Sequence, residues 1–93
     1  MTKISDRTQR AALDMAAALG MDAAYAAETL GRALDSPVEG IAALTRQGFL
    51  FKVGMKEWIR ALTEQGRVAE AQALILTEVE SAYKGAAGAR NAA

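Results

Sequence analysis

The sequence predicts an all-α protein, a compact bundle of about five short helices. Apolar residues recur at helical spacing in successive segments, and glycines stand near the ends of most of these segments. The one short apolar run with strand character, residues 49–51, has no second strand to pair with. We expect a single helical domain over residues 1–84, followed by a flexible, disordered tail of small residues over 85–93.

The first helix is expected to begin after Ser5, an N-cap residue, and to end at Gly20. Asp6 places a negative charge in the first turn, where it complements the helix dipole. The expected apolar stripe is thin and rich in alanine: Ala12, Met15, Ala16 and Leu19.

A second helix is expected to begin at its cap Asp22 and to run to about Leu34. Gly31 lies inside its apolar pattern, where glycine costs about 1 kcal/mol relative to alanine. We interpret Gly31 as the site of a close helix crossing. The connection to the next helix is only Asp35 and Ser36, so the chain must turn sharply.

The third helix has the clearest start signal in the chain. Ser36 and Glu39 have the spacing of a capping box, and Pro37 occupies the first helical position. The helix is expected to end at Gly48. The apolar residues 49–51 then form a connector across the core.

The fourth helix is expected to present Met55, Trp58, Ile59 and Leu62 on one face and to end at Gly66. Together with the connector it carries the only tryptophan and both phenylalanines, and burial of each such ring contributes roughly 2–3 kcal/mol. This unit is expected to seed the core.

The last helix is expected over roughly Val68 to Tyr83. Its apolar face is wider than a contact with one neighbour requires, which favours a central position in the bundle over a flank that meets a partner. Its glutamates Glu70, Glu78 and Glu80 are expected on a solvated face.

Composition excludes several function classes. Lys plus Arg and Asp plus Glu are 11 each, which argues against a nucleic-acid footprint. The chain has no Cys and no His, so disulfides, Cys or His metal ligands and a histidine base are excluded. No apolar run reaches the roughly 20 residues of a membrane span. No phosphate-binding glycine motif is present, and the carboxylates are interpreted as caps or solvated charges. We predict no catalytic, metal or cofactor-binding residue.

The residues that can contact a partner are Phe49, Phe51 and Trp58, with Lys52 and Lys56 beside them. Core packing is the favoured interpretation of the aromatic residues, because a chain this poor in large side chains needs them inside. For the two lysines, a solvated helix face is the favoured interpretation. The alternative is that they line one edge of a binding site for an anionic partner.

A set of short motifs follows in a fixed order along the chain. The pieces are ALG at 18–20 with Asp22, LGRAL at 30–34, PVEGIAAL at 37–44, GFLF at 48–51, Lys56 with Ile59 and Leu62, AQ at 71–72 with IL at 75–76, and YKGAA at 83–87. In order and spacing this pattern resembles an internal helical region of the tail tape measure proteins of long-tailed bacteriophages and prophages. Lys52 and Arg67 depart from the family, which tends to place helix caps there, and Lys84 stands where a second glycine is usual.

The resemblance implies a structural role without catalysis or cofactors, in tail-length determination and assembly. The implied partners are other phage tail proteins or tail assembly chaperones, and the implied location is the virion tail, with the bacterial cytoplasm during assembly. Alanine-rich first helices would suit a domain that unfolds to pass a narrow channel.

Two alternatives remain. One is a free-standing helical adaptor with a Phe/Trp-lined groove. The other is a helix–turn–helix nucleic-acid binder, which the balanced charges of residues 55–64 disfavour.

Overall fold

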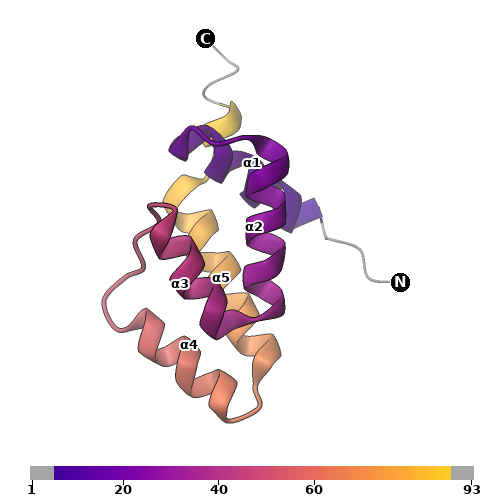
Figure 1. Ribbon diagram of the computed structural model, residues 1–93. Coiled ribbons are helices and arrows are strands. Elements are labelled where there is room, and N and C mark those ends of the chain that lie inside the picture. Colours follow the sequence, from indigo (N-terminus) through magenta and orange to yellow (C-terminus); the bar gives the residue numbers. More distant parts are fainter. Residues whose placement is uncertain (1–5, 89–93) are drawn as a thin grey trace.

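The computed structural model describes residues 6–88 and confirms the all-α fold over that part of the chain (Figure 1). The expected cap Ser5 and tail residues 89–93 lie outside the described residues. The helices are α1 (Asp6–Leu19), α2 (Ala23–Asp35), α3 (Pro37–Arg46), α4 (Met55–Glu64) and α5 (Val68–Tyr83).

Helix α5 is the centre of the bundle, as its wide apolar face predicted. It packs against each of the other four helices, and Figure 1 shows α2 and α3 in front of it. Helix α4 lies at the lower edge of the view and packs mainly against α3 and α5. The number of neighbours therefore differs strongly between these two amphipathic helices.

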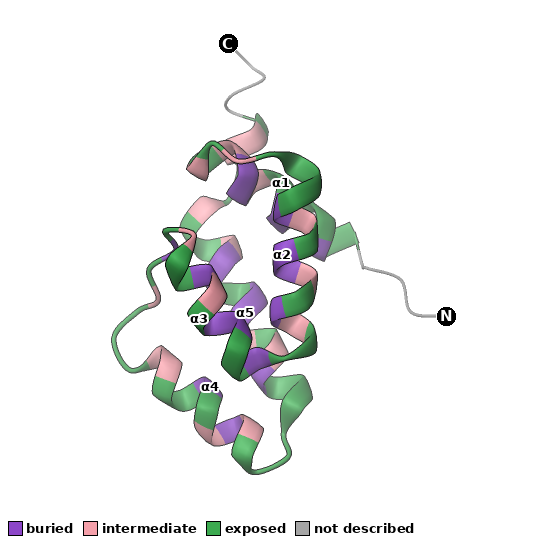
Figure 2. Cartoon of the chain, viewed as in Figure 1, coloured by how far each residue is buried: buried purple, intermediate pink, exposed green. Residues whose placement is uncertain are grey.

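The core is continuous through the bundle, and Figure 2 shows buried positions on the facing sides of the helices. Every helix contributes, and so does the connector between α3 and α4. The largest fully buried side chains are Phe49, Met15, Leu30, Ile41, Leu44, Ile59, Ile75 and Val79.

Helix ends follow the sequence signals closely. The carboxylate of Asp22 accepts a hydrogen bond from the Tyr25 N–H at 3.1 Å, as an N-cap should. Gly48 follows α3 with φ of 108°, a conformation open to glycine, and the next N–H, that of Phe49, donates to the Leu44 carbonyl at 3.0 Å. The end of α3 is thus coupled directly to the burial of Phe49.

The predicted capping box at Ser36 is wrong. Pro37 does occupy the first helical position, but the Ser36 side chain makes no capping hydrogen bond. Its φ and ψ of −133° and 82° serve the sharp turn from α2 instead, and its N–H donates to the Arg32 carbonyl at 3.0 Å. The backbone of Ser36 serves both helix ends, since its carbonyl accepts the Gly40 N–H at 2.7 Å, while its side chain does not cap α3.

The close helix crossing predicted at Gly31 lies elsewhere. Nothing approaches within 4 Å of a Cβ placed on Gly31. A Cβ on Gly40 in α3 would lie 2.6 Å from the Ala33 Cβ and 2.7 Å from the Ala33 carbonyl oxygen in α2. Gly40 therefore lets α2 and α3 approach, and Gly31 is open to solvent on its side of α2.

Part of the expected C-terminal tail is placed against α1. The N–H groups of Gly85 and Ala87 donate to the two carboxylate oxygens of Asp14 at 3.1 and 3.0 Å. The described chain thus extends past the boundary expected at Lys84, and Asp14 acts as an anchor for residues 85–88. Within residues 6–88, no helix is long and apolar enough to cross a membrane.

Candidate interaction surface

The connector between α3 and α4 alternates between buried and exposed side chains. Phe49 is 1% exposed, and its ring meets the edges of Phe51 at 4.7 Å and Tyr83 at 5.6 Å between ring centroids. The core interpretation is therefore confirmed for Phe49, and Phe51 is half-buried against the core. Because an extended segment points successive side chains to opposite sides, Leu50 between them faces solvent.

A buried carboxylate fixes the connector to α5. Glu78, expected on a solvated face, is 5% exposed. One of its oxygens accepts the Lys52 N–H at 3.1 Å, and the other lies 3.5 Å from the Lys52 Nζ. The connector crosses α5 at this point, which removes the side chain from water and supplies its partners. The helical spacing of residues within α5 could not predict that the connector crosses Glu78.

Trp58 is 54% exposed, and its expected place on the buried face of α4 is wrong. Ile59 and Leu62 of the same helix are buried. At 100° per residue, roughly, Trp58 lies on the flank of the stripe that these two residues define. Since α4 sits at the edge of the bundle, its packed stripe is narrower than its apolar stripe, and the indole is left outside.

Three exposed apolar side chains therefore occur within residues 50–58. Leu50 is 83% exposed, Val53 is fully exposed, and Trp58 is half-exposed. Lys52, with its side chain 70% exposed, and half-buried Lys56 lie in the same segment. We call these five residues the connector surface. Sequence reasoning named Trp58 and the lysines but missed Leu50 and Val53, whose outward direction depends on the burial of Phe49.

In the described part of the chain, no group of three or more acidic side chains is placed to hold a metal ion. The shifted groups lie elsewhere: a hydrogen bond from Arg7 lowers the pKa of Glu80, and burial raises the pKa of Tyr83. Each of these shifts follows from packing or an ion pair in the bundle. The connector surface offers exposed apolar side chains beside two lysines, of which Lys52 is paired with Glu78.

Comparisons with protein-family profiles, with curated proteins and with solved structures gave no match to this chain.

Proposed function

We propose that this chain is a structural and assembly domain of a phage or prophage tail, corresponding to an internal helical region of a tape measure protein, and that it has no catalytic role. The order and spacing of the family motifs along residues 18–87 carry the proposal. Several of these motifs fall at helix junctions: ALG closes α1, PVEGIAAL begins with α3, and GFLF forms the connector.

The connector surface supplies a means of assembly. Leu50 and Val53 lie on a connector anchored from both sides, by Phe49 in the core and by Glu78 in α5. An apolar surface held on a fixed backbone loses little conformational freedom on binding. Other tail proteins or a tail assembly chaperone are the proposed partners of this surface.

The test is genetic and structural. In the bacterium that encodes the chain, a deletion of its coding segment is expected to abolish tails or change their length, as seen by electron microscopy of induced lysates. Peptides of the chain are expected in purified tails by mass spectrometry. Normal tails in the deletion strain, without peptides of this chain in the wild-type particles, would contradict the proposal.

Point variants separate the surface from the fold. The pair Leu50→Ser and Val53→Ser removes exposed apolar area, and Val38→Ser in α3, 39% exposed, is the matched control outside the surface. Tail assembly is expected to fail in the double variant and to proceed in the control. Equal assembly in both would remove the connector surface from the proposal.

A second function, a free-standing adaptor that binds a partner protein, is favoured by the same exposed apolar residues. Light scattering over a concentration series, with Trp58 fluorescence, bears on this alternative. Concentration-dependent association with a shift of the Trp58 emission would favour an adaptor or self-assembling module. A monomer with unchanged emission leaves the tail domain as the better proposal.

A further inference from the structure

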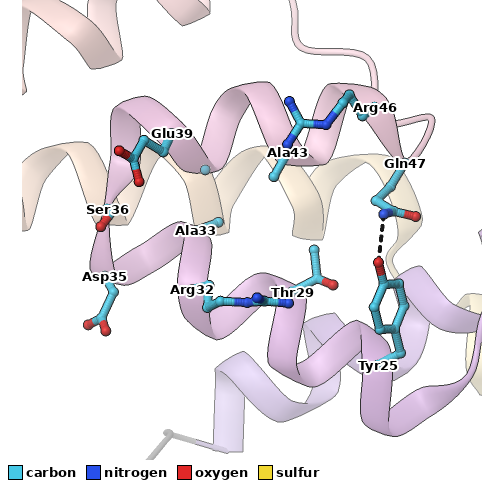
Figure 3. A pocket seen from close by; sticks show the side chains of 11 residues that line it. Tyr25, Thr29, Arg32, Ala33, Asp35, Ser36, Glu39, Ala43, Arg46 and Gln47 are labelled. Atoms are coloured by element: carbon cyan, nitrogen blue, oxygen red, sulfur yellow. Dashed lines mark hydrogen bonds between the residues drawn. The ribbon is translucent and has the colours of Figure 1, made fainter.

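A polar groove of about 460 Å³ lies between α2 and α3, away from the connector surface (Figure 3). The two helices are joined by Ser36 alone and touch at Ala33 and Gly40. They run in opposite senses, so the start of α2 faces the end of α3. Figure 3 shows Tyr25 and Gln47 at one end of the groove and Asp35 and Glu39 at the other.

The middle of the groove carries free donors. Arg32 lines it from α2 and Arg46 from α3 on the opposite wall (Figure 3), and neither guanidinium has a hydrogen bond or an ion pair with another described residue. The guanidinium of Arg7, in contrast, holds Glu80 at 2.7 Å. The Gln47 Nε2 donates to the Tyr25 hydroxyl oxygen at 2.9 Å, which leaves the tyrosine proton free to donate. The middle of the groove therefore suits a carboxylate, which the planar guanidinium fork matches.

The floor of the groove holds a buried hydroxyl without a partner. Thr29 is 5% exposed, and its Oγ1 makes no hydrogen bond. Other helical threonines behave differently: the hydroxyls of Thr45 and Thr63 donate to the carbonyls four residues earlier, at 2.7 and 2.8 Å. An unsatisfied buried hydroxyl is costly and calls for a partner that the chain itself does not supply.

The second end of the groove carries the opposite charge. Asp35 and Glu39 line it, and neither carboxylate has an ion-pair partner among the described residues. Glu39 and Arg46 lie seven residues apart on α3, which corresponds to about 10 Å along the helix axis. About three residues of extended chain cover that distance.

We propose that the α2–α3 groove binds an extended peptide segment of a partner protein, with an acidic side chain between Arg32 and Arg46 and a basic side chain, about three residues away, at Asp35 and Glu39. The ligand is bipolar because the groove is bipolar, and a simple anion would meet two carboxylates as well as two arginines. The partner contact is polar, in contrast with the apolar connector surface, and does not depend on the tail function proposed above.

The experiment is an NMR titration of the ¹⁵N-labelled chain that follows the backbone amides and the arginine Nε–H groups. The probes are the blocked peptides Asp-Ala-Ala-Lys and Lys-Ala-Ala-Asp, the uncharged peptide Asn-Ala-Ala-Gln, and inorganic phosphate. One charged peptide is expected to shift the Nε–H groups of Arg32 and Arg46 and the amides near Thr29. The uncharged peptide is expected to leave them in place.

Variants locate the two charges. Arg46→Gln is expected to weaken the preferred peptide about tenfold, the effect of one charge-assisted contact, and Glu39→Gln is expected to remove the preference for a lysine in the peptide. Arg60→Gln, an exposed arginine of α4 outside the groove, is the matched control and should bind as the wild type does. Far-UV circular dichroism checks that each variant stays folded.

Three outcomes overturn the proposal. Absence of shifts at Arg32 and Arg46 at the highest peptide concentration shows that the groove does not bind such a segment. Phosphate binding as tight as the charged peptides shows a simple anion site. Equal weakening by Arg46→Gln and Arg60→Gln shows only a general effect of net charge.

Discussion

Substitution of Gly40 by alanine tests the packing of α2 on α3 most directly. The new Cβ would meet the Cα, the Cβ and the carbonyl oxygen of Ala33, the last two at 2.6 and 2.7 Å. Carbon atoms in contact prefer about 3.5–4.0 Å, so the helices must separate by about 1 Å. Such overpacking costs about 1–3 kcal/mol, and more where backbone must move, against a gain of about 1 kcal/mol in helix propensity. Because the clash involves the Ala33 Cα and carbonyl oxygen, the upper end of this cost applies, and we expect a net loss of about 2 kcal/mol.

Gly31→Ala is the matched control, because it makes the same chemical change in a helix with nothing within 4 Å of the new methyl group. It is expected to stabilise the fold by about 0.5–1 kcal/mol through helix propensity. Urea unfolding followed by far-UV circular dichroism measures both variants. Adding Ala33→Gly to Gly40→Ala should restore stability only in part, since the Ala33 Cα and carbonyl remain in the way. A Gly40→Ala variant as stable as the wild type would refute the described crossing.

Three further predictions concern the connector, Trp58 and the ion pair between α1 and α5. Glu78→Ala is expected to cost about 1–3 kcal/mol in urea unfolding because the Lys52 N–H loses its acceptor, whereas Lys52→Ala, which keeps this N–H and removes only the exposed ammonium 3.5 Å from the carboxylate, is expected to cost less. Phe49→Ala is expected to cost about 3–5 kcal/mol and Trp58→Ala about 1 kcal/mol or less; similar losses in both would contradict the exposure of Trp58. Arg7 lowers the pKa of Glu80 below its ordinary value of 4.5, so their pair stabilises the fold above that pH and is lost as pH falls through the lowered value. The stabilities of the wild type and Arg7→Gln should therefore converge in acid, and a constant difference with pH would count against the pair.

Periodicity in the sequence predicted which side of each helix is apolar, but not how many neighbours that side meets. Helix α5 has four neighbours and buries its wide face, including Glu78 where the connector crosses. Helix α4 lies at the edge and leaves Trp58 half-exposed with an equally clear pattern. These differences arise from contacts between segments far apart in the chain, which no local spacing contains.

The glycines show the same difference between local and long-range effects. Gly48 ends α3 through its own backbone conformation, a local property that the sequence predicted. Gly31 and Gly40 both lie inside helices, and only the arrangement of α2 on α3 decides which of them touches a neighbour. The α2–α3 groove escaped prediction for the same reason: Arg32 and Arg46 are 14 positions apart and line one groove only because the chain reverses at Ser36.

Helix α1 is expected to be the first part of the bundle to open. Apart from Met15, its buried residues are alanines and Thr8, and alanine buries little apolar area. Long-range hydrogen bonds of α1 that lie near the surface run from Arg7 to Glu80 and from the Gly85 and Ala87 N–H groups to Asp14. Native-state hydrogen exchange should therefore give the α1 amides a lower opening free energy than the amides of α5 around Ile75 and Val79. Sequential opening from α1 would suit the proposed domain of a tail protein that unfolds in a narrow channel. If the amides of α1 and α5 exchanged with the same opening free energy, the bundle would open only as a unit, and this support for the proposal would be lost.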